Sequence, residues 1–282
     1  MNLSRRQMLK LTAGTAAALA AGVRLPAAAA AAKKIPIGLG LWSVRQQCEK
    51  DLPGVLKAIG EMGYDGVEFA HSYYGHEAPA IRKLLDDNGL ACCGMHMGLP
   101  MLDGEAFDAT VKIHKTLGTP YLIIASLPRR NTESVQALVE TGKKFNELSK
   151  KLADHGMKIG YHCHGGDFEP VEGKIPWVVF GENTDPEVIL QLDIGNAIGG
   201  GGDAIAMLKH FPGRSISVHL KEHGGPAGAV IGEGDVNWKE VFQICESTGG
   251  TKWYVVEDET REGPESIEAV RRCLQSLRKM GK

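Results

Sequence analysis

Once its first 32 residues are set aside, the sequence has no long hydrophobic run and no excess of charge of one sign. No later stretch approaches the roughly 20 consecutive apolar residues that a membrane span requires. Acidic and basic residues number 34 and 32, which gives a formal net charge of −2. This balance provides no general attraction to nucleic acid or to anionic membranes. We therefore expect no nucleic-acid partner and no stable membrane insertion of the chain after residue 32.

The sequence also lacks the regular cysteine spacing of a disulfide framework. Its six cysteines lie mostly inside apolar runs: Cys48, Cys92, Cys93, Cys163, Cys245 and Cys273. An even number of cysteines in an exported protein would allow three disulfides. A chain of 282 residues can bury a sufficient core without them, and a protein that folds before export does so in a reducing compartment. We therefore predict buried free thiols.

The first 32 residues have the composition of an export signal. A basic start over residues 4–10 contains Arg5 and Arg6, and an apolar run over 11–21 and an alanine tract over 27–32 follow it. This order is typical of a secretory signal, and the paired arginines indicate the twin-arginine type. The alternative is an alanine-rich helix, which would have no polar face. We predict a twin-arginine signal peptide over residues 1–32 and a periplasmic location for the domain over residues 33–282.

Short apolar runs alternate with longer amphipathic stretches after the signal. The apolar runs predict eight strands, over residues 37–43, 66–70, 91–97, 121–126, 158–164, 188–194, 215–222 and 253–257. Helices are expected over residues 51–62, 78–88, 104–117, 132–155, 203–210, 237–248 and 264–280. The stretch after the fifth strand is richer in loop residues, and the glycine run over 199–202 is expected to be a loop.

This alternation predicts an α/β fold of the (β/α)8 TIM barrel type. Near-continuous apolar strands separated by helices indicate a parallel sheet covered by helices, and eight such units in about 250 residues indicate a closed barrel. The alternative is an open doubly wound sheet. It lacks support because no Gly-x-Gly-x-x-Gly motif follows the first strand.

Six of the eight predicted strands end in ionisable residues. In such a barrel the catalytic side chains gather where strands end and loops begin. The acids and histidines at these ends include Glu68, His96, His162, His164, Asp193, His219 and Glu257. Burying so many ionisable groups together is costly unless a cation neutralises them. Carboxylate and imidazole ligands predict a divalent metal ion, namely manganese, magnesium, cobalt, zinc or iron, and no cysteine cluster indicates a thiolate zinc site.

Five segments on successive strands carry a recognisable set of motifs. They cover residues 37–45, 161–164 followed by Phe168 and Glu169, 192–193, 219–222 and 256–259. In this order they resemble the xylose isomerase-like barrels known as sugar phosphate isomerases/epimerases, over nearly all of the chain after the signal. That family includes ketose epimerases, dehydratases, a DNA-repair endonuclease branch, and lyases or hydrolases acting on 3-keto-glycosides.

The resemblance implies a metal site with one departure from the family pattern. Ketose epimerases of the family hold their metal with Glu, Asp, His and Glu from strands five to eight, which implies Asp193, His219 and Glu257 as ligands, with Mn²⁺ the favoured ion. At strand five this chain has His162 in place of glutamate. The fourth ligand is then His162, His164 or Glu169, and Glu169 is favoured because it restores the charge of the site.

We expect a divalent-metal-dependent sugar isomerase or epimerase that removes a proton next to a carbonyl through a metal-bound enediolate. Glu257, His162 or His164 would act as the base. Lys221 alternates with His219, so it faces inward and would stabilise the enediolate oxygen. Glu68, His96 and His164 are expected to contact the carbohydrate substrate.

Two other functions remain open. One is a lyase, hydrolase or dehydratase acting on a 3-keto-glycoside or related keto-sugar, because the same intermediate can expel a β-substituent. The other is a non-catalytic exported sugar-binding protein. Export favours an unphosphorylated sugar and, together with the slightly negative net charge, argues against the endonuclease branch. A homo-oligomer is compatible with the sequence.

Overall fold

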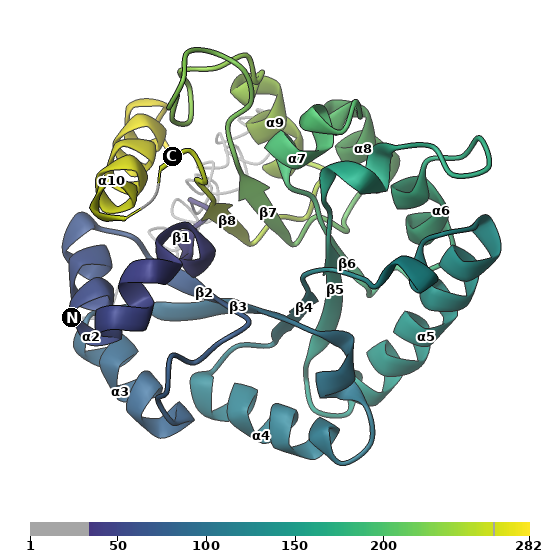
Figure 1. The fold of residues 1–282 in the computed structure, drawn as a ribbon, viewed down its shortest axis with the longest axis horizontal. Coiled ribbons are helices and arrows are strands. Elements are labelled where there is room, and N and C mark those ends of the chain that lie inside the picture. The colour runs from purple at the N-terminus through teal and green to yellow at the C-terminus, as the bar shows by residue number, and fades with distance from the viewer. Residues whose placement is uncertain (1–33, 262) are drawn as a thin grey trace, which may run out of the picture. The chain divides into compact units, whose positions relative to one another are not determined.

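Eight parallel strands form the centre of the protein (Figure 1). The computed structural model describes residues 34–261 and 263–282, so the predicted signal peptide lies outside the described residues. The strands are β1 Ile37–Gly40, β2 Gly66–Ala70, β3 Ala91–Met97, β4 Tyr121–Ile124, β5 Lys158–His162, β6 Ile189–Gln191, β7 Ser217–Leu220 and β8 Trp253–Val256. Each of the eight predicted strands is therefore present, and several end earlier than predicted.

The sheet closes almost completely on itself. Its order is β6-β5-β4-β3-β2-β1-β8-β7, with parallel pairing throughout. Between the terminal strands β6 and β7, an isolated parallel bridge joins Asp193 to His219, and the His219 N–H donates to the Leu192 carbonyl at 2.9 Å. The predicted (β/α)8 TIM barrel is confirmed, and two predicted metal ligands lie at the seam where it closes.

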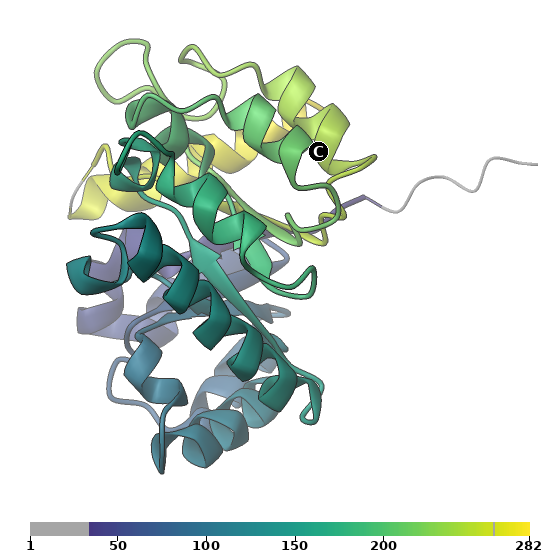
Figure 2. The same ribbon diagram turned by 90° about the vertical axis from the view of Figure 1, so that its right-hand side faces the viewer.

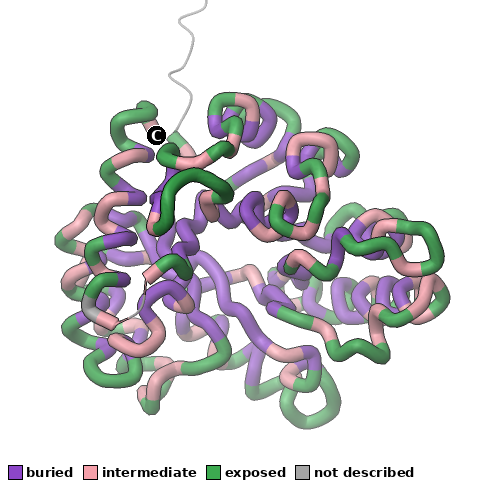
Figure 3. Tube along the Cα trace, turned by 45° about the horizontal axis from the view of Figure 1, so that its top comes forward, coloured by how far each residue is buried: buried purple, intermediate pink, exposed green. Residues whose placement is uncertain are grey.

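Helices surround the strands and cover their outer side. They are α2 Arg45–Met62, α3 Ala78–Asp87, α4 Ala106–Leu117, α5 Val135–Ala153, α6 Pro176–Glu182, α7 Ile194–Gly199, α8 Ala204–His210, α9 Trp238–Cys245 and α10 Pro264–Lys279. In the side view, α5 and α6 lie in front of the strands (Figure 2). The trace coloured by burial shows buried strands at the centre and exposed segments at the periphery (Figure 3).

Two short helices differ from the sequence expectation. α6 forms in the stretch that was expected to be rich in loop residues, and α7 begins directly after Asp193 and takes up the start of the glycine run. Asp193 caps α7, because its Oδ1 accepts a hydrogen bond from the Asn196 N–H at 2.7 Å. Helices of six or seven residues are too short to show a clear apolar period in the sequence.

One continuous hydrophobic core fills the barrel wall and the layer beneath the helices. Strand residues such as Leu39, Val67 and Val255 are fully buried, as expected where helices cover a parallel sheet. All six cysteines are free and buried, which confirms the prediction of free thiols. Every described helix is too short or too polar to cross a bilayer.

Candidate active site

Six ionisable side chains, each on a strand or within two residues of its end, converge at the carboxyl ends of the barrel strands. They share a high degree of burial, with at most 6% of each residue exposed: Glu68, His96, His162, Asp193, His219 and Glu257. They meet because the carboxyl ends of the barrel strands gather at one mouth. The alternation of side chains along each strand turns these six toward the inside. The structure therefore brings together most of the residues that the sequence singled out.

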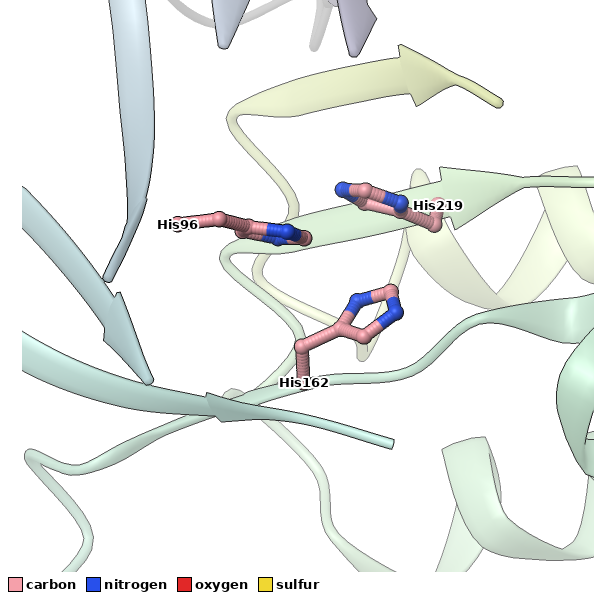
Figure 4. A group of neighbouring side chains, drawn as sticks. All are labelled: His96, His162 and His219. Atoms are coloured by element: carbon pink, nitrogen blue, oxygen red, sulfur yellow. The ribbon is translucent and has the colours of Figure 1, made fainter. Parts of the chain in front are cut away.

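Two overlapping groups among these residues have the spacing of metal ligands. In one group, ligand atoms of His162, Asp193, His219 and Glu257 all lie within 4.8 Å of one another. The other group consists of His96, His162 and His219. Figure 4 shows the three imidazole rings converging from different strands. Their centroids are 4.5 Å apart between His162 and His219, and 5.0 Å apart between His96 and His219.

His219 lies between two carboxylates. Its Nε2 contacts Glu68 Oε2 at 2.6 Å and its Nδ1 contacts Glu257 Oε2 at 3.0 Å. Burial would lower the pKa of His219, but Glu68 and Glu257 raise it to about 10. Burial would likewise raise the pKa of Glu257, but the hydrogen bond and charge of His219 hold it well below its usual range. The ring is thereby fixed, with Nε2 toward Glu68 and Nδ1 toward the four-residue group.

Asp193 has one carboxylate oxygen without a partner. Its Oδ1 caps α7, whereas Oδ2 is buried and accepts no hydrogen bond from any described residue. This oxygen lies 3.9 Å from His219 Nδ1. Burial and the negative charge of Glu257 raise the pKa of Asp193 to about 7. Buried oxygens rarely remain unsatisfied, and one that faces an imidazole and a second carboxylate suits a bound cation.

Lys221 is the cation at the outer edge of the four-residue group of His162, Asp193, His219 and Glu257. Its Nζ donates to Glu257 Oε1 at 3.2 Å and also to Glu259 Oε2. Burial would lower the pKa of Lys221, but Glu257 and Asp193 raise it above its usual value. Glu259 in turn accepts a hydrogen bond from Trp42 Nε1 at 2.7 Å. The inward orientation predicted for Lys221 from its alternation with His219 is the one that the structure has.

A buried glutamine, which the sequence analysis did not identify, connects the histidines. Gln191 is fully buried at the end of β6. Its Oε1 lies 2.7 Å from His96 Nε2 and 3.0 Å from His162 Nδ1. Its Nε2 donates to Glu68 Oε1 and to Ser217 Oγ, both at 2.9 Å. The alternation Gln191-Leu192-Asp193 was the available signal, because it places Gln191 on the inward face with Asp193.

Glu68 and His96 lie deeper than their predicted role in substrate contact suggests. Glu68 Oε2 contacts His219 and His96, at 2.6 and 2.9 Å, while its Oε1 accepts from Gln191. Burial would raise the pKa of Glu68, but the charges of His96 and His219 hold it well below its usual range. Both oxygens are therefore occupied by protein donors, and Glu68 supports the histidines from below.

Glu169 does not join either group of metal-ligating residues. The 3₁₀ turn η4 (Gly165–Phe168) follows β5, and Glu169 comes directly after it with an exposed side chain. Its favoured assignment as the fourth ligand therefore has no support in the structure, and His162 occupies that position in the four-residue group. The reason is the turn itself, which leads the chain away from the strand end before Glu169 is reached.

His164 is exposed at the mouth of the barrel, and its ring packs edge-on against His162 with centroids 5.0 Å apart. It also lines a cavity of about 480 Å³ between the loops that follow β4 and β5. The polar residues of that cavity include Arg129, Glu133, Asp167 and Glu169. His164 thus lies between the metal-ligating group and a space large enough for a further part of a ligand.

Comparisons with known proteins agree with this architecture. The family model described as "Xylose isomerase-like TIM barrel" matches residues 56–280. An inosose dehydratase of Geobacillus kaustophilus is 26% identical over 203 residues, which are 61% of this chain and 65% of that protein. The matched region thus covers less than two-thirds of this relative's length.

Two solved structures share the fold. A sugar phosphate isomerase/epimerase of Parabacteroides distasonis superimposes with a TM-score of 0.74 at 23% identity, over 88% of this chain and 95% of that one. A protein named IOLI, solved with a bound zinc atom, superimposes with a TM-score of 0.66 at 16% identity, over 86% of this chain and 95% of that one. At these identities the likeness establishes the fold alone.

Proposed function

The chain belongs to the xylose isomerase-like TIM barrel family, and we propose that it is a divalent-metal-dependent isomerase or epimerase of an unphosphorylated sugar. The reaction begins with removal of a proton next to a carbonyl. The observation that carries the proposal is the four-residue group of His162, Asp193, His219 and Glu257, with the unpartnered Oδ2 of Asp193 inside it. Two carboxylates and two imidazoles are a donor set that a divalent ion accepts.

These four residues would hold the metal. A bound divalent ion supplies a Lewis acid that polarises a carbonyl and lowers the pKa of the neighbouring C–H. The chain's own groups would carry out the rest of the chemistry. Lys221 Nζ donates hydrogen bonds to the oxygen on which negative charge develops. The exposed imidazole of His164 at the mouth accepts the carbon proton, and delivery of a proton to the other face or to the neighbouring carbon gives the epimer or the isomer.

The charges around the mouth favour an unphosphorylated substrate. Lys221 already pairs with Glu257 and Glu259. In the neighbouring cavity, Arg129 is accompanied by the exposed carboxylates of Glu133 and Glu169. Carboxylates this close would repel a phosphate dianion and offset the attraction of a single guanidinium. The predicted export signal leads to the same expectation.

A second candidate reaction is elimination, as in a dehydratase or a lyase of a 3-keto-glycoside. Two observations favour it. Curated relatives of this chain are named inosose dehydratase, and the cavity beside His164 offers room for the group that would leave. Loss of a β-substituent starts from the same proton removal, so one set of residues serves both reactions.

Turnover of candidate sugars by metal-loaded protein in D₂O tests the proposal. Deuterium incorporated next to the carbonyl of a recovered isomer or epimer supports isomerisation, whereas release of water or an aglycone selects elimination. The test variants are Asp193→Asn and Glu257→Gln, which should lose both the bound metal and turnover. The enzyme hypothesis fails if these variants retain both. Saturable sugar binding without turnover or exchange would instead identify a sugar-binding protein.

A further inference from the structure

We propose that Gln191 is a positioning residue that holds His162 in its Nδ1–H form, which makes Nε2 of His162 the fourth metal-binding atom. The inference deepens the proposed function, because it concerns the metal site on which that function rests. It assigns the position at which this chain departs from the glutamate of the ketose epimerases. It also gives a role to a residue that bears no charge and contacts no solvent.

The four contacts of Gln191 fix which way its amide points. Its Nε2 contacts Glu68 Oε1 and Ser217 Oγ at 2.9 Å. An ionised carboxylate only accepts hydrogen bonds, so the group that faces Glu68 is the NH₂. The reverse orientation would place the amide oxygen against a carboxylate oxygen and leave Glu68 Oε1 buried without its donor. The Oε1 atom of Gln191 therefore faces the histidines.

This orientation fixes the proton on His162. An amide oxygen cannot donate, so the His162 Nδ1 at 3.0 Å from Oε1 must carry the hydrogen. His96 Nε2, at 2.7 Å from the same oxygen, donates in the same way. A neutral imidazole with a hydrogen on Nδ1 has its lone pair on Nε2. His162 Nε2 makes no hydrogen bond to any residue that the structure describes, so its lone pair is available to a ligand.

The surroundings of His162 favour a neutral ring. The rings of His96 and His219 lie 4.6 and 4.5 Å away, and His162 is buried. Histidine binds metals as the neutral imidazole, and a hydrogen-bond acceptor on its other nitrogen sets the tautomer and orients the ring. Gln191 occupies this supporting position for His162, as Glu68 does for His219.

The charge of the four proposed ligands agrees with this assignment. With a metal bound, His162 and His219 would be neutral imidazoles, and Asp193 and Glu257 would contribute two negative charges, equal in size to the charge of one divalent cation. A glutamate at the fourth position would add a third negative charge to this ligand set. The site therefore does not need Glu169 for charge balance, and the exposed position of Glu169 outside the group is consistent with that.

Metal affinity and the state of the His162 ring test the inference without any substrate. Gln191→Met preserves the length of the side chain and removes both the acceptor and the donors. We expect it to weaken Mn²⁺ binding, measured by calorimetry, by about 10- to 100-fold, as is usual when a partner of a ligating histidine is lost. Ser217→Ala removes one contact of Gln191 but none of His162, and it should retain the wild-type Kd.

Long-range ¹H–¹⁵N correlation spectra of metal-free wild-type protein provide the second readout. The His162 signals, assigned from their loss in His162→Gln, should show the hydrogen on Nδ1. This measurement identifies the tautomer of His162 in the wild-type protein, so it tests the inference even if Gln191→Met does not fold. A merely structural role for Gln191 would lower stability in urea without changing the metal Kd of the folded variant.

Several outcomes would overturn the inference. They are a wild-type Mn²⁺ affinity in Gln191→Met, a hydrogen on Nε2 of His162, or a loss of affinity in Glu169→Gln that His162→Gln does not share. Failure of the proposed function is a separate result. Tight Mn²⁺ binding that depends on Gln191, without turnover of any sugar, would contradict the proposed enzymatic function and still support the role of Gln191.

Discussion

The loops after β5 and β6 each contain a buried aspartate, and the two differ in the hydrogen bonding of one carboxylate oxygen. Asp167 accepts a hydrogen bond on each oxygen, from the Tyr161 hydroxyl at 2.8 Å and the His164 N–H at 2.7 Å. Asp193 accepts one from the Asn196 N–H, and its other oxygen has no partner among the described residues. Burial is the main cause that raises both pKa values, to about 6 for Asp167 and about 7 for Asp193.

The difference shows how the same residue type serves two purposes in adjacent loops. Asp167 ties the turn η4 to the end of β5, and its donors are supplied locally. Leaving a buried oxygen unsatisfied costs about 1–3 kcal/mol, so Asp193 Oδ2 is retained at the expense of stability. Its neighbours are His219 and Glu257, which are the groups that would share a cation with it.

The largest expected effect comes from exchanging the two aspartates for asparagine in turn. Asp193→Asn should weaken Mn²⁺ binding by more than about 100-fold, because it removes a direct ligand rather than a supporting residue, and turnover should be lost with the metal. Asp167→Asn is the matched control and should bind Mn²⁺ as the wild type does. Calorimetry and metal analysis after dialysis measure both. Equal losses in the two variants would mean that the unpartnered oxygen does not mark a ligand.

The next largest effect is expected at Lys221, whose ammonium group pairs with Glu257 in the four-residue group that contains Asp193. Lys221→Met keeps most of the aliphatic length and removes the charge. We expect kcat to fall by about 100- to 1,000-fold, as when one donor to a developing oxyanion is removed. Metal content should be unchanged, since Lys221 is a donor and not a ligand. Stopped assays and metal analysis on one preparation separate the two effects, and an unaltered kcat would remove Lys221 from the chemistry.

The pH dependence of stability isolates Asp167. Burial raises the pKa of the Asp167 carboxyl from its ordinary value of 3.8 to about 6, so the folded state binds more protons than the unfolded state between these values. Stability is therefore lost as pH rises through this window and is constant above it. The loss should approach about 2–3 kcal/mol, at 1.36 kcal/mol per pKa unit. The uncharged amide that Asp167→Asn introduces can bond both partners, so this variant should lack the pH-dependent component.

Urea unfolding of metal-free protein between pH 4 and 8 measures this component, as the difference in unfolding free energy between wild type and Asp167→Asn. Other groups titrate in both proteins and cancel in the difference. A difference that does not change with pH would mean that Asp167 ionises alike in the folded and unfolded chains.

Much of the barrel could be predicted from the sequence, because buried parallel strands are continuous apolar runs. The bounds of β2 and β3 match the predicted 66–70 and 91–97. The sixth strand was predicted over 188–194 but ends at Gln191. Leu192 and Ile194 continue the apolar pattern while the backbone already turns into α7, and hydrophobicity does not reveal that turn.

The ligand group was partly predictable for a similar reason. The meeting of strand ends at one mouth made Asp193, His219 and Glu257 candidates, and the resemblance to the ketose epimerases implied that these three are ligands. For the fourth position, a charge argument favoured Glu169, yet the structure brings His162 there and leaves Glu169 exposed. The path of the loop after β5 decided this, and it has no simple sequence signal. Gln191 was overlooked because an amide carries no charge, although its alternation with Asp193 marked it.

The smallest expected effect lies at the rim, where exposure should make a polar contact inexpensive to lose. Trp42→Phe removes the N–H that donates to Glu259 and preserves a ring for the guanidinium of Arg45, which lies 4.3 Å from the Trp42 ring centroid. Water can replace the lost donor at this exposed site, so the cost should be about 0.5 kcal/mol, at the low end for a hydrogen bond. KM and kcat should each change by less than about threefold, since 1.4 kcal/mol is tenfold. A larger loss, measured as kcat/KM, would show that Glu259 depends on Trp42 as strictly as the buried carboxylates depend on their partners. The contrast between the fully hydrogen-bonded Asp167 and the unpartnered oxygen of Asp193 would then have to be extended to the contacts at the rim.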